Sequence, residues 1–105
     1  MIYLDNAATG GEKPASVVSA VLASMQGCAN PGRSGHRRSV ALAERVLACR
    51  RLLSDLFDGY GFERVAFTKN CTEALNIAIL GTLRAGDHVV TTCLEHNSVL
   101  RPLEY

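Results

Sequence analysis

Two parts of this chain carry residues that could bind an anion and move protons. Cys71 and Thr72 follow Asn70 at the predicted start of a helix, and His96 follows a predicted strand further along. The first amides of a helix have no acceptor within it, and the helix dipole places about half a positive charge behind them. The Thr72 hydroxyl adds a side-chain donor, so this helix start is a candidate site for an anion such as phosphate.

The residues around Cys71 predict a strand that turns directly into a helix. Val65 to Thr68 has the β-branched and aromatic character of a short buried strand. Asn70 is a good N-cap, and Glu73, three positions later, can reach back to the cap's own amide as in a capping box. The same pattern also fits an ordinary first turn whose amides bind only water, because most strand-to-helix turns bind no ligand.

A second strand follows this helix and completes a βαβ unit. The helix is apolar on several sides, which predicts that it is buried in the core, and Gly86-Asp87 is expected to end it. His88 to Thr92 then reads as a strand, so the fold class is α/β with a mostly parallel sheet and a right-handed crossover. Ligands of such sheets bind beyond the carboxyl ends of the strands, where Cys71, Thr72 and His96 would converge.

The first sixty residues predict an arm, two helices and a loop. Residues 5–11 are small and turn-prone, which suits an arm that passes close to another surface. Pro14 and Gly27 bracket an amphipathic helix, and a longer helix is expected from about Arg38 to Phe57, ended by Asp58-Gly59. Between the two helices, Pro31 and two glycines rule out regular structure.

Composition excludes several classes of function. The 105 residues allow one domain at most, and 48% hydrophobic content with a net charge of +1 describes an ordinary globular segment. The arginines are balanced by acidic residues without an aromatic platform, so no nucleic-acid partner is expected. The four cysteines form no C-x-x-C pair, which predicts reduced thiols and no metal. No apolar run approaches the length of a membrane span, so we expect a cytoplasmic protein that does not contact a membrane.

Five segments in a consistent order match one known family. The segments are Tyr3-Leu4-Asp5-Asn6-Ala7-Ala8-Thr9, Lys13-Pro14, Asn30-Pro31-Gly32-Arg33-Ser34-Gly35-His36, Phe67-Thr68-Lys69-Asn70-Cys71-Thr72-Glu73-Ala74-Leu75-Asn76 and Glu95-His96-Asn97-Ser98. In these segments the chain resembles the class V branch of the pyridoxal-phosphate enzymes of aspartate aminotransferase fold (fold type I). Within that branch it is most similar to the cysteine desulfurases and selenocysteine lyases.

The resemblance implies a role for each matching segment. Cys71 and Thr72 correspond to the helix start that holds the phosphate of pyridoxal 5'-phosphate, and His96 to the histidine that stacks on the pyridine ring and assists proton transfer. Ala7 and Ala8 resemble the arm that borders the substrate pocket. Asn30, Arg33 and His36 lie in a loop that resembles one reaching towards the partner subunit's site in the family's homodimers.

The resemblance also implies residues that this chain lacks. The family needs a Schiff-base lysine and, in desulfurases, a loop cysteine that takes sulfur; Lys13 and Lys69 are the lysines present, and neither matches. Residues 1–105 are therefore expected to be the N-terminal arm and the first part of the large cofactor-binding domain, inactive alone, with a new helix starting after Pro102. The remainder of the enzyme would be absent.

The parent enzyme is expected to be a cysteine desulfurase-like lyase that releases sulfur from L-cysteine, gives alanine and passes sulfur to an acceptor protein. An aminotransferase is the nearest alternative, since the residues that choose the reaction are missing. A different class of function, a non-catalytic dimerisation or binding module, would apply if the 105 residues were the whole product. Its helices would then expose apolar faces that predict self-association.

Overall fold

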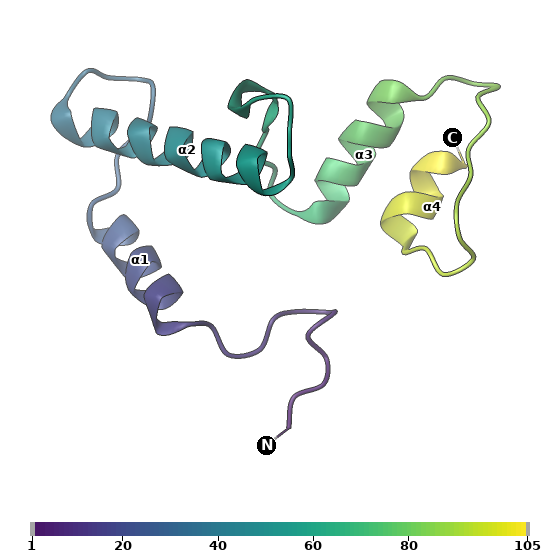
Figure 1. Ribbon diagram of the computed structural model, residues 1–105, viewed down its shortest axis with the longest axis horizontal. Helices are drawn as coiled ribbons and strands as arrows, with labels where there is room; N and C mark the ends of the chain where they lie inside the picture. The colour runs from purple at the N-terminus through teal and green to yellow at the C-terminus, as the bar shows by residue number, and fades with distance from the viewer. Residues whose placement is uncertain (1, 105) are drawn as a thin grey trace. The chain divides into compact units, whose positions relative to one another are not determined.

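The computed structural model of the chain describes residues 2–104 and shows helices joined by irregular segments (Figure 1). The helices are α1 (Ala15–Gln26), α2 (Arg37–Leu56), α3 (Cys71–Thr82) and α4 (Asn97–Leu103), with a 3-10 turn at Phe62–Arg64. They fall into two compact units, one that extends to Phe62 and one that begins at Glu63. The first unit contains α1 and α2, and the second contains α3 and α4.

Local backbone chemistry sets both ends of α1. Pro14 is the N-cap, and its carbonyl accepts hydrogen bonds from the amides of Val17 and Val18 at 2.9 and 3.2 Å. The helix ends where the amide of Gly27 donates to the carbonyl of Ala23 at 3.1 Å. The boundaries predicted from Pro14 and Gly27 are therefore confirmed.

Side-chain and backbone caps likewise define α2. His36 is the N-cap, and its Nδ1 accepts from the amide of Ser39 at 3.2 Å. At the other end Asp58 has a left-handed backbone with φ of 50°, and the amide of Gly59 donates to the carbonyl of Ser54 at 2.7 Å. This pattern is a Schellman motif, which satisfies a carbonyl of the last helical turn. The predicted stop at Asp58-Gly59 is confirmed.

In the second unit, α3 packs against α4, the one pair of helices that pack together within residues 2–104. The chain leaves α3 through a turn in which the amide of Arg84 donates to Asp87 Oδ2 at 2.8 Å, and it returns along residues 88–96. Figure 1 shows α3 and α4 side by side and running in the same direction. Their N-terminal ends consequently lie at the same end of this unit.

Two predicted helix boundaries in the second unit are wrong. α3 ends at Thr82 rather than at Gly86-Asp87, because Leu83 has extended backbone with ψ of 151°. α4 begins at Asn97 rather than after Pro102, because the side chain of His96 caps it by accepting a hydrogen bond from the amide of Ser98. Pro102 instead lies inside the helix.

The predicted sheet is not seen in the part of the chain that the structure describes. Residues 65–68 and 88–92, both expected to be strands, are irregular, and no strand occurs within residues 2–104. A strand exists only with a neighbour that pairs its backbone groups, and a parallel pair is stable only as part of a covered, larger sheet. The helix of the expected βαβ unit is present as α3, but its flanking strands are unpaired here.

Pro102 is buried, but no Ala, Val, Leu, Ile, Met, Cys, Phe or Tyr side chain is buried within the described residues, so the predicted apolar core is absent. The buried polar residues are Ser39, Ser54 and Ser98. The apolar composition of α3 predicts that this helix lies in the core. In the structure, however, the side chains of Ile77 and Leu80 are 61% and 56% exposed. The all-round apolar character of α3 predicts burial on several sides, and α4 covers only one of them.

Candidate functional site

The first turn of α3 is fixed by a cap that uses one of its free amides. Asn70 Oδ1 accepts from the amide of Glu73 at 2.9 Å, and Glu73 Oε2 accepts from the amide of Lys69 at 2.8 Å. The bond from the Glu73 amide to Asn70 confirms one half of the predicted capping box. The other half is wrong, because the Glu73 carboxylate binds the amide of Lys69 and not that of Asn70. Thr68 Oγ1 also donates to the carbonyl of Asn70 at 2.9 Å and holds the turn from the other side.

Two backbone donors stay open at this helix start. The Asn70 side chain satisfies the Glu73 amide, and the amide of Ala74 makes the first intrahelical bond, to the carbonyl of Asn70 at 3.2 Å. The amides of Cys71 and Thr72 are left, at the positive end of the helix dipole. Both residues are exposed, so an anion can reach these amides and the Thr72 hydroxyl.

His96 is held by its ring nitrogen at the start of α4. Its Nδ1 accepts from the amide of Ser98 at 3.1 Å and lies 2.9 Å from Ser98 Oγ. The residue itself is exposed, whereas Ser98 is 8% exposed. Because an amide N–H can only donate, the neutral ring that accepts from it carries its proton on Nε2.

The loop before His96 is braced by a second local contact. Thr92 Oγ1 donates to Glu95 Oε1 at 3.0 Å, and the amide of Leu94 donates to Thr92 Oγ1 at 3.3 Å. These bonds shape residues 92–95 as a tight turn that feeds directly into the capped start of α4. The turn therefore limits the directions in which the imidazole can project.

The structure brings the predicted cofactor residues to one end of the second unit. Cys71 and Thr72 begin α3, His96 caps α4, and the two helices lie side by side with the same direction. Open amides, a hydroxyl and an imidazole are groups that suit a phosphate monoester attached to a flat heteroaromatic ring. The donor chemistry at the start of α3 is of the kind that suits a phosphate group.

The arm residues Ala7 and Ala8 lie in the first unit, within a loop closed by its own side chains. Tyr3 Oη donates to the carbonyl of Thr9 at 2.8 Å, and Asn6 Oδ1 accepts from the amide of Gly11 at 3.0 Å. Lys13 Nζ makes two further hydrogen bonds within the arm, to the carbonyls of Gly10 and Gly11. Lys13 is thereby engaged by the arm itself.

The loop that contains Asn30, Arg33 and His36 is anchored to α2. Ser39 has no exposed surface, and its hydroxyl donates to the carbonyl of Asn30. His36 caps α2 through Nδ1, while Arg33 is exposed at the tip of the loop. These three residues and the arm belong to the first unit, whereas the starts of α3 and α4 belong to the second.

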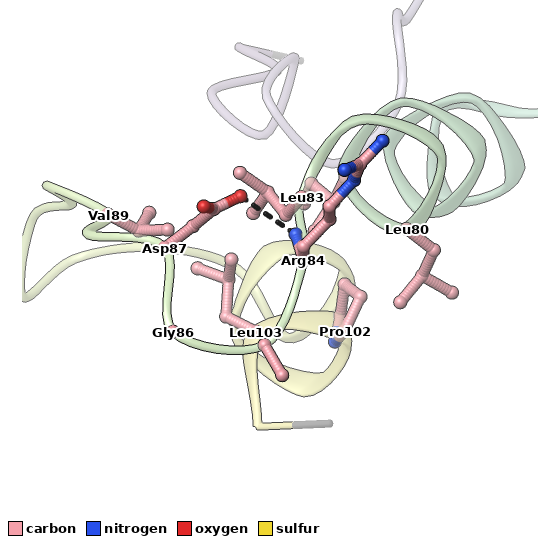
Figure 2. Close-up of a pocket in the computed structure, with 10 residues that line it drawn as sticks. Leu80, Leu83, Arg84, Gly86, Asp87, Val89, Pro102 and Leu103 are labelled. Carbon is pink, nitrogen blue, oxygen red and sulfur yellow. Dashed lines mark hydrogen bonds between the residues drawn. The ribbon is translucent and has the colours of Figure 1, made fainter.

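A hollow of about 460 Å³ lies at the opposite end of α3 and is not part of this site. Figure 2 shows Leu80 of α3 and Leu83, which directly follows α3, facing Pro102 and Leu103 of α4 across it, with the hydrogen bond from Arg84 to Asp87 at its rim. α3 has 12 residues, and each adds about 1.5 Å, which separates this hollow from Thr72 by most of the helix. Its lining combines apolar side chains of both helices with Arg84 and Asp87.

No metal site or membrane span is found in residues 2–104. They contain no group of three His, Cys, Asp or Glu side chains arranged to hold a metal ion, and the four cysteines are exposed free thiols. None of the helices in this range combines the length and apolar character that crossing a bilayer requires.

Comparison with known proteins assigns the family. Residues 2–105 match the family model described as aminotransferase class-V. The chain is 33% identical over 107 residues to a probable cysteine desulfurase of Synechocystis sp., and 36% identical over 106 residues to one of Pyrococcus abyssi, with 97% of this chain covered in each case. It is 39% identical over 102 residues, 94% of its length, to a cysteine desulfurase of Bradyrhizobium diazoefficiens.

The chain therefore belongs to the aminotransferase class-V family, whose members have the fold type I architecture and in general depend on pyridoxal phosphate. Among its relatives, those named cysteine desulfurase are similar over almost all of this chain. The chain spans about a quarter of their length, 25 to 26% in the three compared. No solved structure matches it.

Sequence reasoning missed the two polar groups that hold the site residues in place. Ser98 was included in the sequence analysis only as part of a matching segment. A serine two positions after a histidine that caps a helix can place its amide and its hydroxyl beside the histidine ring. The Lys69 amide, which binds Glu73, was also missed. The polar character of both stretches was visible, but which atoms pair depends on backbone geometry.

Proposed function

We propose that this chain supplies the phosphate-binding part of a pyridoxal-phosphate enzyme that acts on an amino acid, and that the enzyme is a cysteine desulfurase. L-cysteine would lose its sulfur to an acceptor protein and leave as alanine. The open N-terminus of α3, in a chain so similar to proteins named cysteine desulfurase, is the observation that carries this proposal.

In this proposal each site residue has a defined task. The amides of Cys71 and Thr72 and the Thr72 hydroxyl bind the phosphate, and the imidazole of His96 lies against the pyridine ring and handles protons at Nε2. When bound, the cofactor supplies an electron sink for the substrate's reacting carbon. Lys13, which donates to the carbonyls of Gly10 and Gly11, and Lys69 do not match the family's Schiff-base segment, and no cysteine matches its sulfur-carrying loop. We therefore assign the lysine that links the cofactor and the cysteine that takes sulfur to residues other than these 105.

The finer features of the family architecture enter as part of the same proposal. Residues 65–68 and 88–92 would form neighbouring strands of a mostly parallel sheet once other strands pair with them. Ala7 and Ala8 would border the substrate, and Asn30, Arg33 and His36 would reach the partner's site in a homodimer. We propose a cytoplasmic location.

Two other functions have specific support. An aminotransferase would use the same phosphate site, and the family model itself carries that description. A non-catalytic dimerisation module is favoured by exposed apolar side chains such as Val21 and Met25, which are 53% and 69% exposed.

The first test is the mass and absorbance of the protein purified from its native gene. The proposal predicts a product several times heavier than 11.3 kDa that is yellow and releases sulfide from L-cysteine in the presence of a thiol. A yellow product that transaminates and releases no sulfide would favour the aminotransferase. A colourless product of 11.3 kDa would contradict the enzyme proposal and favour the module.

In that protein Thr72→Ala tests the phosphate site itself. Removing a hydrogen bond to a charged group costs about 1.5 to 3 kcal/mol. The Thr72→Ala variant should therefore bind the cofactor about tenfold or more weakly than wild type. Thr82→Ala is the matched control, because Thr82 lies at the far end of α3 and its hydroxyl donates to the carbonyl of Ala78 at 2.6 Å. Equal retention by wild type and Thr72→Ala would contradict the assignment of Thr72.

A further inference from the structure

The end of α2 carries a chemically labile pair of residues, Asp58-Gly59. In an Asp-Gly pair the amide nitrogen of the glycine can attack the side-chain carboxyl carbon of the aspartate, because glycine has no side chain to hinder the approach. Every other Asp and Asn of the chain is followed by a residue that has a side chain. Asp58 is therefore the position at which the sequence favours conversion of aspartate to isoaspartate.

The geometry of this helix end favours both members of the pair. Asp58 has φ of 50°, in the left-handed region, where Asp is one of the few non-glycine residues that are readily tolerated. An ideal Cβ on Gly59 would lie 3.2 Å from Ser54 Oγ and 3.4 Å from the Ser54 carbonyl oxygen, so a side chain there would press on the last helical turn. The Schellman motif thus places the labile pair at this point.

The same motif shields the attacking nitrogen. The amide of Gly59 donates to the carbonyl of Ser54 at 2.7 Å, and the amide of Asp58 donates to the carbonyl of Asp55 at 3.3 Å. Attack requires the Gly59 amide to lose its proton, and that proton lies in a short hydrogen bond beside Ser54, which is 6% exposed. Water and hydroxide therefore reach it when the helix end opens.

We propose that Asp58-Gly59 is a modification site that is gated by the Schellman motif at the end of α2. When the motif opens, the Gly59 nitrogen bonds to Cγ of Asp58, and the carboxyl OH and the amide proton leave together as water. Water then adds to one of the two carbonyl carbons of the resulting succinimide ring. Addition at the main-chain carbonyl of residue 58 breaks its bond to nitrogen and leaves isoaspartate, whereas addition at Cγ restores aspartate.

The modification changes the backbone at the point where α2 ends. Isoaspartate adds one methylene group to the main chain between Cα of residue 58 and the amide of Gly59. That amide then cannot close the same hydrogen-bonded ring with Ser54, so a modified chain does not re-form the motif. The reaction uses water alone, without an oxidant or a cofactor, and the inference does not rest on the proposed function.

Parallel rate measurements test the gate. Protein expressed from its native gene is incubated at urea concentrations below and above its unfolding transition, and isoaspartate at residue 58 is quantified by peptide mapping with mass spectrometry. Hydrogen exchange at the Gly59 amide is measured in the same solutions. We expect isoaspartate to form about tenfold or more slowly in the folded protein than in the unfolded chain, and below the transition to speed up with urea by the same factor as the exchange.

Two outcomes of these measurements would overturn the inference. One is an equal rate of isoaspartate formation in the folded and the unfolded protein. The other is a rate below the transition that does not follow hydrogen exchange at Gly59, because the gate requires both processes to depend on the same opening.

Variants separate the gate from the reacting pair. Leu52→Gly weakens the end of α2 at a side chain that is 70% exposed, and should speed isoaspartate formation about threefold. Leu22→Gly, at a position of α1 that is 55% exposed, is the matched control and should leave the rate unchanged. Asp58→Asn reacts by loss of ammonia and should show the same ratio of unfolded to folded rates as wild type. An unchanged rate in Leu52→Gly, or a folded Asp58→Asn variant that reacts as fast as its unfolded form, would contradict the gate.

Discussion

At the first turn of α3, a single side chain decides how many backbone donors face the solvent. Asn70 Oδ1 takes the amide of Glu73 and leaves those of Cys71 and Thr72. Its neutral amide side chain performs this role without adding charge where an anion would bind. The identity of the cap therefore affects the stability of the helix and, under the proposed function, the affinity of this helix start for phosphate.

Two substitutions of Asn70 should separate these effects. Asn70→Ala removes the acceptor for the Glu73 amide and should destabilise α3 by about 1 kcal/mol, measured as lost amide protection in hydrogen exchange. Asn70→Asp keeps an acceptor and should preserve that protection. In the cofactor-binding protein, however, its negative charge should weaken retention of a phosphate. If Asn70→Asp bound pyridoxal phosphate as tightly as wild type, the anion site would not lie at this turn.

At this scale the sequence predicts candidate residues and misses some of the atoms with which they pair. The spacing of Asn70 and Glu73 correctly predicts the bond from the Glu73 amide to Asn70, but the Glu73 carboxylate binds the amide of Lys69 and not the predicted amide of Asn70. His96 was predicted as a site residue, but its cap on α4 was not, because histidine is not among the preferred N-cap residues. Pairings of this kind depend on the backbone angles of one or two residues.

At the scale of the element, close packing rather than burial shapes the N-terminal arm. An ideal Cβ placed on Gly11 would lie 2.8 Å from Cδ1 of Tyr3, which is closer than real side-chain atoms approach. The ring of Tyr3 thus rests directly on the backbone of Gly11, and its hydroxyl reaches the carbonyl of Thr9. The shape of the arm depends on the absence of a side chain at this position.

Gly11→Ala should therefore open the arm. The added methyl displaces the Tyr3 ring, breaks its hydrogen bond to Thr9 and weakens the bond from residue 11 to Asn6, so the amide at position 11 should exchange faster with D2O. Gly35→Ala is the matched control, because its Cβ would meet no atom within 4 Å. Equal exchange at position 11 in wild type and Gly11→Ala would show that this packing is absent in solution.

Local sequence signals are sufficient to predict some of the helix boundaries. Pro14, Gly27 and Asp58-Gly59 act on the backbone beside them, and the predicted ends of α1 and α2 agree with the structure. The end of α3 was placed too late because Gly86-Asp87 belongs to a separate turn that starts at Arg84. The predicted strands remain unconfirmed, since pairing depends on chain segments distant in sequence.

At the scale of the whole molecule, apolar side chains are common and unburied. The chain is 48% hydrophobic, yet the fully shielded side chain among the described residues is a serine, Ser39. On α1, an open hollow of about 580 Å³ is lined by Val17, Val21 and Met25 together with Leu42 of α2. Composition predicts how much apolar surface must be covered but does not say what covers it.

The 105-residue chain by itself should associate through such surfaces. Sedimentation velocity should show a sedimentation coefficient that rises with concentration, because exposed apolar faces of this kind drive association. Val21→Lys places a charge in the middle of the α1 face and should reduce association. Ser19→Lys, on an exposed position of the same helix, is the control. A monomer at all concentrations would contradict this expectation and the module hypothesis with it.

The side-chain bonds of the arm also bear on the order in which the chain folds. Each one joins residues only two to six positions apart, from Tyr3 to Lys13. Closing a loop of about ten residues takes roughly 10–100 ns, and the entropy lost in doing so is small compared with that of pairing distant strands. The turn that presents Ala7 and Ala8 can therefore form during synthesis, long before the surface it would border has folded.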